Sequence, residues 1–140
     1  MVRPTLYELD GANRVLPLVR SIVRDVVEEF QDLKAAGREQ RAIEARPGGN
    51  AMAVRRLGAL RSEVGDRTTR IERYLRELEA LGIELRDLET GLVDFPALIE
   101  GEPAYFCWKP GDPEVAFWHL ASRGFADRRP VGRPAARERT

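Results

Sequence analysis

The sequence has a single cysteine, a single histidine, only two lysines and no long apolar run. One cysteine cannot form an internal disulfide, so the fold does not depend on an oxidising compartment. No segment has the roughly 20 apolar residues that a membrane-spanning helix needs. Pro4, Gly11 and Pro17 interrupt the N-terminal stretch, which argues against a signal peptide. These absences predict a soluble, cytoplasmic protein without a membrane partner.

An excess of charge of either sign is also lacking, because 23 basic residues balance 23 acidic residues. A net charge of zero gives no general attraction to nucleic acid or to acidic lipid. The basic residues are nearly all arginines, which form paired hydrogen bonds with carboxylates and phosphates. Acidic residues are interleaved with the arginines of the second predicted helix, so nucleic-acid binding there is the least favoured hypothesis.

The chain is long enough for one domain with a small core, since it has 140 residues of which 43% are hydrophobic. We expect a single domain spanning 1–140. Within it we expect a helical hairpin at 8–82, a β-rich module at 83–130 and a disordered tail at 131–140.

Two segments have the periodicity of amphipathic helices. Apolar residues recur every three or four positions from about Leu9 to Leu33, and again after Asn50 as far as Leu81. The first pattern fades from Gly37 onward, and a turn with Pro47 precedes Asn50, which is placed to cap the second helix. Together these segments predict an antiparallel helical hairpin.

A hairpin of two helices leaves apolar surface uncovered. Either the C-terminal module or a second copy of the chain covers that surface. The near-heptad spacing of the apolar residues favours a coiled-coil seam of four helices, and we therefore expect a homodimer.

Beyond Gly82 the apolar residues alternate with polar ones, as in half-buried strands. Proline- and glycine-rich turns separate the apolar segments, and short connections favour an antiparallel meander. The fold class is thus α+β, a long antiparallel helical hairpin followed by a small antiparallel β meander. The last segment is alternatively one helical turn after Asp112 and Pro113. The expected strands are 83–88, 91–96, 104–108 and 115–119.

Asp94 lies inside an apolar segment of the β-rich module. Its carboxylate either faces solvent or is buried with a partner, because an unpaired buried charge is costly. The arginines that could pair with it are Arg86, Arg128 and Arg129.

His119 is the only side chain whose ordinary titration range is near neutral pH. It is either bonded to a backbone carbonyl, or it acts as a general base or metal ligand oriented by Asp94, Asp112 or Glu114. Alternation in the last strand places His119 and Phe117 on one face.

Cys107 lies between Phe106 and Trp108 and fits a small buried side chain. A nucleophilic role would require His119 beside it. Zinc would need carboxylates in addition, and Asp94 and Glu114 are the candidates.

Several short motifs of the module resemble an uncharacterised bacterial family, domain of unknown function 2203. The helical first half and the opening around Ala12 and Asn13 are similar as well. The resemblance covers nearly the whole chain and implies no particular activity. The matching pieces are Gly82-Ile83 with Arg86-Asp87, Gly91 to Pro96, Cys107-Trp108, Trp118-His119, and Gly124-Phe125 with Arg128.

We predict a non-enzymatic protein, in which the hairpin mediates self-association and the β module presents a recognition site. The alternative is a small hydrolytic or metal-dependent enzyme using Asp94 and His119, with a divalent metal held by these two residues and Glu114. The residues expected in the recognition site are Asp94, Trp108, Trp118, His119 and Arg128.

Overall fold

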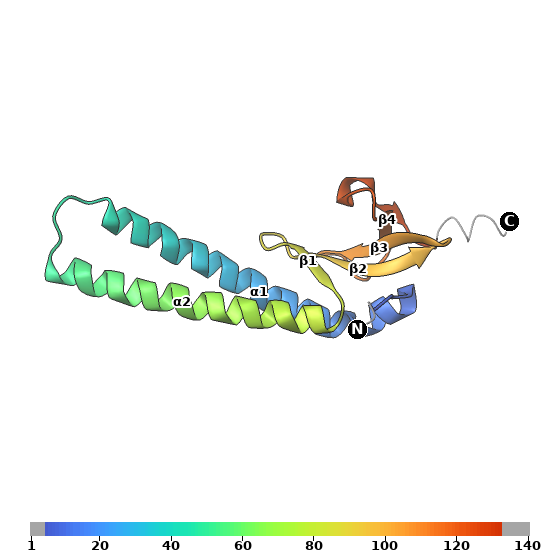
Figure 1. The fold of residues 1–140 in the computed structure, drawn as a ribbon, viewed down its shortest axis with the longest axis horizontal. Helices are drawn as coiled ribbons and strands as arrows, with labels where there is room; N and C mark the ends of the chain where they lie inside the picture. Colours follow the sequence, from blue (N-terminus) through green and yellow to red (C-terminus); the bar gives the residue numbers. More distant parts are fainter. Residues whose placement is uncertain (1–4, 133–140) are drawn as a thin grey trace.

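A computed structural model describes residues 5–132 (Figure 1). Two long helices form a hairpin, and a five-stranded antiparallel sheet in the order β1-β2-β3-β4-β5 follows. The predicted α+β fold, a helical hairpin followed by a meander, is confirmed. The elements are α1 (Leu9–Glu44), α2 (Ala51–Ala80), β1 (Glu84–Asp87), β2 (Leu92–Ile99), β3 (Glu102–Trp108), β4 (Phe117–Leu120), the 3-10 helix η1 (Phe125–Asp127) and β5 (Arg129–Pro130).

The first helix is longer than its apolar pattern indicates, because α1 continues past Gly37 to Glu44. Ion pairs to α2 support this extension: Glu39 accepts two hydrogen bonds from Arg56, at 2.7 and 2.8 Å. The predicted cap of α2 is confirmed, since the Asn50 side chain accepts a hydrogen bond from the Ala53 amide at 2.8 Å. Polar contacts thus link the two helices where the apolar stripe weakens.

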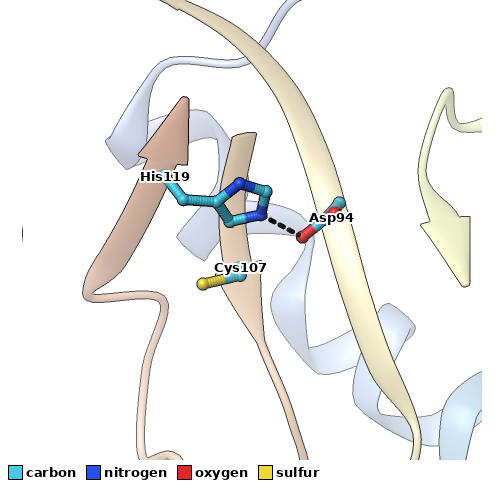
Figure 2. Close-up of side chains that lie close together, drawn as sticks. All are labelled: Asp94, Cys107 and His119. Atoms are coloured by element: carbon cyan, nitrogen blue, oxygen red, sulfur yellow. Dashed lines mark hydrogen bonds and ion pairs between the residues drawn. The ribbon is translucent and has the colours of Figure 1, made fainter. Parts of the chain in front are cut away.

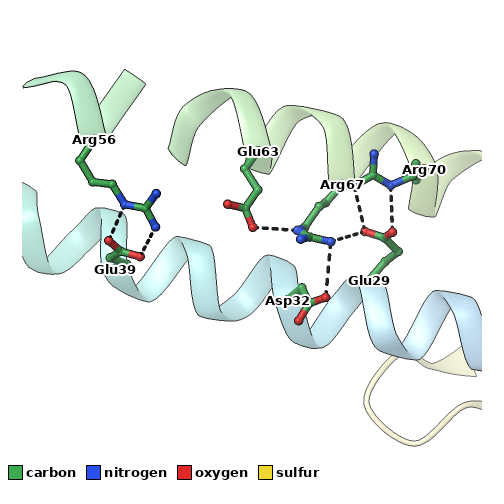
Figure 3. Close-up of polar contacts among 7 residues, drawn as sticks. All are labelled: Glu29, Asp32, Glu39, Arg56, Glu63, Arg67 and Arg70. Atoms are coloured by element: carbon green, nitrogen blue, oxygen red, sulfur yellow. Dashed lines mark hydrogen bonds and ion pairs between the residues drawn. The ribbon is translucent and has the colours of Figure 1, made fainter. Parts of the chain in front are cut away.

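A cluster of charged residues joins the two helices midway along the hairpin (Figure 3). Glu29 of α1 accepts a hydrogen bond from Arg67 of α2 at 2.8 Å and two from Arg70 at 2.8 and 3.3 Å. Arg67 also contacts Asp32 and Glu63. The pKa of Glu29 is lowered, chiefly by the hydrogen bond from Arg70.

The core lies between the sheet and the N-terminal half of α1. Leu16, Val19, Val23 and Val26 are buried on this helix and belong to one cluster with the inward-facing residues of the sheet. The rest of the hairpin extends beyond the sheet (Figure 1). Fewer residues are buried there: between positions 27 and 70 they are Ala36 and Leu60.

The segment before α1 connects the helices to the sheet. The Tyr7 amide donates to the Pro96 carbonyl at 2.7 Å, and the Tyr7 hydroxyl donates to the Leu81 carbonyl. The Tyr7 ring also packs edge-on against Phe95, with centroids 5.3 Å apart. The Pro96 carbonyl bonds Tyr7, so the Pro96 nitrogen also lies on the side of β2 away from β3. Strand β1 does not reach this position. The missing N–H of proline therefore costs no hydrogen bond between strands, and β2 continues through Pro96.

The connection between β3 and β4 differs from both sequence hypotheses. Residues 113–116 form neither a helical turn nor a strand, and β4 begins at Phe117 rather than at 115. The Asn13 side chain explains this, because it forms a hydrogen bond with each backbone group of Val115. Asn13 Nδ2 donates to the Val115 carbonyl at 3.0 Å, and Asn13 Oδ1 accepts from the Val115 backbone N–H at 2.7 Å. Val115 is thereby bonded to α1 instead of to a strand.

Strand β5 was not expected from the sequence. It has only two residues, one of them Pro130, and it pairs with β4 through Phe117 and Trp118. Most of the expected C-terminal tail, residues 133–140, lies outside the described residues. Neither helix of the described part combines the length and apolar character that crossing a membrane requires.

Candidate functional site

One face of the sheet carries polar residues, whereas the other packs on α1. Asp94 pairs in register with Cys107, and Tyr105 pairs with His119. Side chains two positions apart on a strand, and those paired across strands, point to the same side. These four side chains therefore share one side of the sheet, which we call the outer face.

Asp94 and His119 meet on the outer face (Figure 2). Both side chains are almost fully buried, with exposed fractions of 3% and 5%. His119 Nε2 lies 3.3 Å from Asp94 Oδ1, and Nδ1 lies 2.9 Å from the carbonyl oxygen of Leu120. A carbonyl oxygen only accepts, so Nδ1 carries a proton and donates it to Leu120. The contact between Nε2 and Oδ1 then needs one further proton, carried by either atom.

Arg86 anchors the second oxygen of Asp94. Its Nε donates to Asp94 Oδ2 at 2.8 Å, and its Nη1 lies 3.0 Å from Glu84. The guanidinium group also lies over the Tyr105 ring, 4.9 Å from the centroid. Of the two sequence hypotheses for Asp94, the structure supports burial with an arginine partner. That partner is Arg86, one of the three arginines considered.

A cavity of about 360 Å³ lies beside the Asp94–His119 pair. Two guanidinium groups, Arg86 and Arg123, line it together with the Asp94 carboxylate. Each guanidinium has a further acidic neighbour, Glu84 at 3.0 Å from Arg86 and Asp127 at 3.7 Å from Arg123. Tyr105 and Phe125 add aromatic surface. The complete lining is Arg86, Leu92, Asp94, Tyr105, His119, Ala121, Arg123, Gly124 and Phe125.

Cys107 lies next to the pair and is completely buried. Burial raises the pKa of its thiol to about 11, with a smaller contribution from the negative charge of Asp94, and Arg128 partly opposes the rise. The thiol therefore carries its proton at neutral pH. Asp94, Cys107 and His119 each offer one potential metal-ligating atom, and these three atoms lie within 4.8 Å of one another.

The two tryptophans lie on the other side of the sheet. Trp108 is 1% exposed in the core, and its indole nitrogen donates to the Asp112 carbonyl at 2.8 Å. Trp118 is partly buried and packs against the same core. Neither is among the residues that line the cavity.

Arg128 and Glu114 also lie away from the cavity lining. The Arg128 guanidinium lies over the Phe117 ring at 4.0 Å and over the Phe125 ring at 4.3 Å. Glu114 is exposed in the β3–β4 connection and is not among the three residues with potential ligating atoms, although the zinc hypothesis grouped it with them. The structure therefore brings Asp94 and His119 together and separates them from Trp108, Trp118 and Glu114.

The hydrogen bonds determine what chemistry this arrangement supports. A catalytic cysteine needs a histidine nitrogen that can remove the thiol proton. Both ring nitrogens of His119 already face oxygen atoms, those of Asp94 and Leu120. The geometry therefore suits binding better than proton removal from Cys107.

Sequence reasoning did not identify Tyr105 and Arg123 as site residues. Tyr105 could have been found from the strand register, since it lies two positions before Cys107 and opposite His119. Arg123 lies outside the strands, and only the path of the chain after β4 brings it to the cavity. No local sequence signal marks it.

No curated protein and no solved structure shows significant similarity to this chain. A family model described as an uncharacterized conserved protein, DUF2203, matches residues 5–131 and so includes both the hairpin and the sheet. The chain belongs to the DUF2203 family.

Proposed function

We propose that this protein is a non-catalytic binding protein, which self-associates through its hairpin and binds a small anionic ligand in the cavity of the outer face. The observation that carries the proposal is the position of Asp94 and His119. Among residues 5–132 they are the only buried polar or charged side chains, and both line the cavity. A buried ionisable pair contributes little to stability compared with apolar residues of the same size. Its position beside a cavity therefore supports a role in binding.

The cavity lining indicates the class of ligand. Arg86 and Arg123 can hold an acidic group, while Tyr105 and Phe125 can contact a flat apolar part. The strands fix Arg86 and Tyr105, which keeps the site preorganised. A small carboxylate or phosphate ester with a planar apolar group matches these features.

Binding is testable with benzoate and phenyl phosphate as probes, measured by saturation-transfer NMR on protein treated with chelator. We expect Arg123→Ala to weaken binding about tenfold or more, the effect of losing one charge-assisted hydrogen bond. Arg123 is suited to this test because its side chain is 60% exposed, so its removal leaves the core intact. Arg73→Ala, at an exposed position of α2, is the matched control. If neither probe binds, or if both variants bind alike, the proposed site is wrong.

The self-association proposal concerns the part of the hairpin that extends beyond the sheet. A groove of about 460 Å³ runs there between α1 and α2. Leu33, Gly37 and Val64 give it apolar surface, and Lys34, Arg41 and Glu44 contribute charges of both signs. A second hairpin would cover this groove and complete a four-helix seam.

Sedimentation over a range of concentrations tests the dimer. Gly37→Glu would place a charge in the groove, while Gly58→Glu would place the same charge on α2, where a Cβ meets no atom within 4 Å. We expect the wild type and Gly58→Glu to dimerise and Gly37→Glu to remain monomeric. A wild-type protein that stays monomeric at every concentration would contradict self-association.

A further inference from the structure

The three potential donor atoms on the outer face come from three adjacent strands. Asp94 of β2, Cys107 of β3 and His119 of β4 project to the same side of the sheet (Figure 2). Their exposed fractions are 3%, 0% and 5%, and their donor atoms lie within 4.8 Å of one another. Donors on paired strands hold their relative positions better than donors on loops.

Two of the donors are oriented by other groups, as is usual for metal ligands. Histidine ligands commonly donate their second ring N–H to a carbonyl, and His119 Nδ1 does so to Leu120 at 2.9 Å. This bond leaves Nε2 as the atom that faces Asp94. Arg86 occupies Oδ2 of Asp94 at 2.8 Å, which leaves Oδ1 for a second partner.

The distance between Nε2 and Oδ1 also fits a metal site. At 3.3 Å it is longer than the 2.7–2.9 Å typical of a charge-assisted hydrogen bond. Two ligands bound tetrahedrally to zinc, each at about 2.0 Å, lie about 3.3 Å apart. The pair thus already has the spacing of one edge of such a tetrahedron.

We propose that Asp94 Oδ1, Cys107 Sγ and His119 Nε2 bind a zinc-class divalent cation on the outer face. This inference rests on the proposed function of the outer face as a binding site, and it names the group that would occupy the floor of the cavity. Thiolate, imidazole and carboxylate together select zinc over magnesium or calcium, which prefer oxygen ligands alone.

The fourth coordination position of the cation would be open to a donor atom from outside the chain. Asp94 and His119 both line the cavity of about 360 Å³, so a water molecule or the acidic group of a bound ligand has room to reach the cation. Three protein ligands with one open position are the arrangement of non-structural zinc sites. Arg86 and Arg123 would then contact the same anion that the cation binds.

Charge and protons balance in this proposal. A thiolate and a carboxylate neutralise the divalent cation, and the imidazole is neutral. Binding breaks the S–H bond of Cys107, whose proton leaves to solvent, and forms a metal–sulfur bond. Nε2 and Oδ1 must both be unprotonated to bind the cation, so a proton carried by either atom leaves as well. Metal uptake therefore releases protons, as it does at other thiolate sites.

Cobalt(II) tests the proposal directly. Because Cys107 is the only cysteine, a sulfur-to-cobalt charge-transfer band in the wild-type protein reports this residue without any substitution. We add cobalt(II) to chelator-treated protein in a buffer with a thiol-free reductant, and then displace it with zinc(II). The expected result is a saturable band at one equivalent, which zinc(II) abolishes. A folded protein without this band overturns the proposal.

Variants separate direct ligands from supporting residues. We expect Cys107→Ser to abolish the charge-transfer band, and Arg86→Met to weaken zinc(II) binding about 10–100-fold, the usual effect of removing a supporting hydrogen bond. Glu114→Gln is the matched control, because this exposed carboxylate lies outside the group of donors, and it should bind as the wild type does. A band that persists in Cys107→Ser, or that is lost in Glu114→Gln, contradicts the assignment.

The outcome is distinguishable from that of the proposed function. Cobalt(II) binding is measured without any organic ligand, whereas binding of benzoate and phenyl phosphate is measured in chelator-treated protein. Binding of an organic probe without a charge-transfer band overturns the metal site and leaves the recognition site standing. A charge-transfer band without probe binding supports the metal site and contradicts the anionic-ligand proposal.

Discussion

At the scale of single residues, the backbone of Gly91 is constrained by α1. Its φ of +83° lies in the left-handed region, and a Cβ there would come within 2.6 Å of Val23 Cγ1. We expect Gly91→Ala to lower the free energy of unfolding by about 2–5 kcal/mol, from the backbone strain and the overpacking together. Urea denaturation measures this. Gly58→Ala is the control, since it fills open space in a helix and should stabilise by about 0.5–1 kcal/mol.

Asn13 fixes the connection between β3 and β4 from a helix that precedes both strands. Asn13→Ala leaves the amide and the carbonyl of the buried Val115 without their partner. We expect a loss of about 1–3 kcal/mol for each buried group left unpaired. Arg14→Ala, at the next and exposed position, should have little effect in the same denaturation experiment. Equal stability of the two variants would show that the Asn13 bonds contribute little.

The residues of the outer face could be predicted only in part. Alternation along the strands places His119 with Phe117 and separates Asp94 from its apolar neighbours, so both could be singled out from the sequence. The partners of these residues depend on strand register, which periodicity does not specify. The sequence therefore allowed three arginines for Asp94, and its zinc hypothesis added the exposed Glu114 to Asp94, Cys107 and His119.

At the scale of the elements, the Glu29 cluster makes the hairpin sensitive to acid. Hydrogen bonds from Arg70 and Arg67 lower the pKa of Glu29 below its ordinary value of 4.5. A carboxyl whose pKa is lower in the folded state adds stability above its unfolded pKa, and that stability is lost as the pH falls through the folded pKa. We expect Glu29→Gln to cost about 1 kcal/mol at neutral pH.

The pH dependence identifies the cause of this cost. Because a glutamine does not titrate, the difference in stability between wild type and Glu29→Gln should shrink as the pH falls below 4.5. Glu28→Gln, an exposed neighbour on α1, should follow the wild type throughout. A difference that is the same at neutral and acidic pH would mean that Glu29 acts by packing rather than by charge.

The elements themselves were largely predictable, and the errors have physical causes. Helical periodicity and the Asn50 cap locate the hairpin, but α1 continues past Gly37, where ion pairs such as Glu39–Arg56 rather than apolar contacts link it to α2. Strand β5 has two residues, one a proline, which is too short for any alternation. Its existence depends on β4 offering an edge, which is a tertiary effect.

At the scale of the whole molecule, burial is distributed unevenly along the hairpin. The part of α1 between Ala12 and Val26 packs against the sheet, whereas between positions 27 and 70 only Ala36 and Leu60 are buried. Local opening requires less free energy where fewer apolar groups are buried. We therefore expect backbone amides of residues 36–60 to exchange with deuterium faster than those of residues 12–26, measured by mass spectrometry on peptide fragments.

Exchange measured at several protein concentrations shows whether residues 36–60 open easily in the single chain or only because a partner copy has dissociated. A second copy that binds only the folded hairpin stabilises it by mass action, so protection of residues 36–60 should rise with concentration. Residues 12–26 contact the sheet of their own chain, and their protection should not change. In Gly37→Glu the concentration dependence should vanish while the difference between the two segments remains. Slow exchange of both segments in dilute protein would contradict the expected local opening of residues 36–60. Wild-type exchange that does not depend on protein concentration would contradict the four-helix seam.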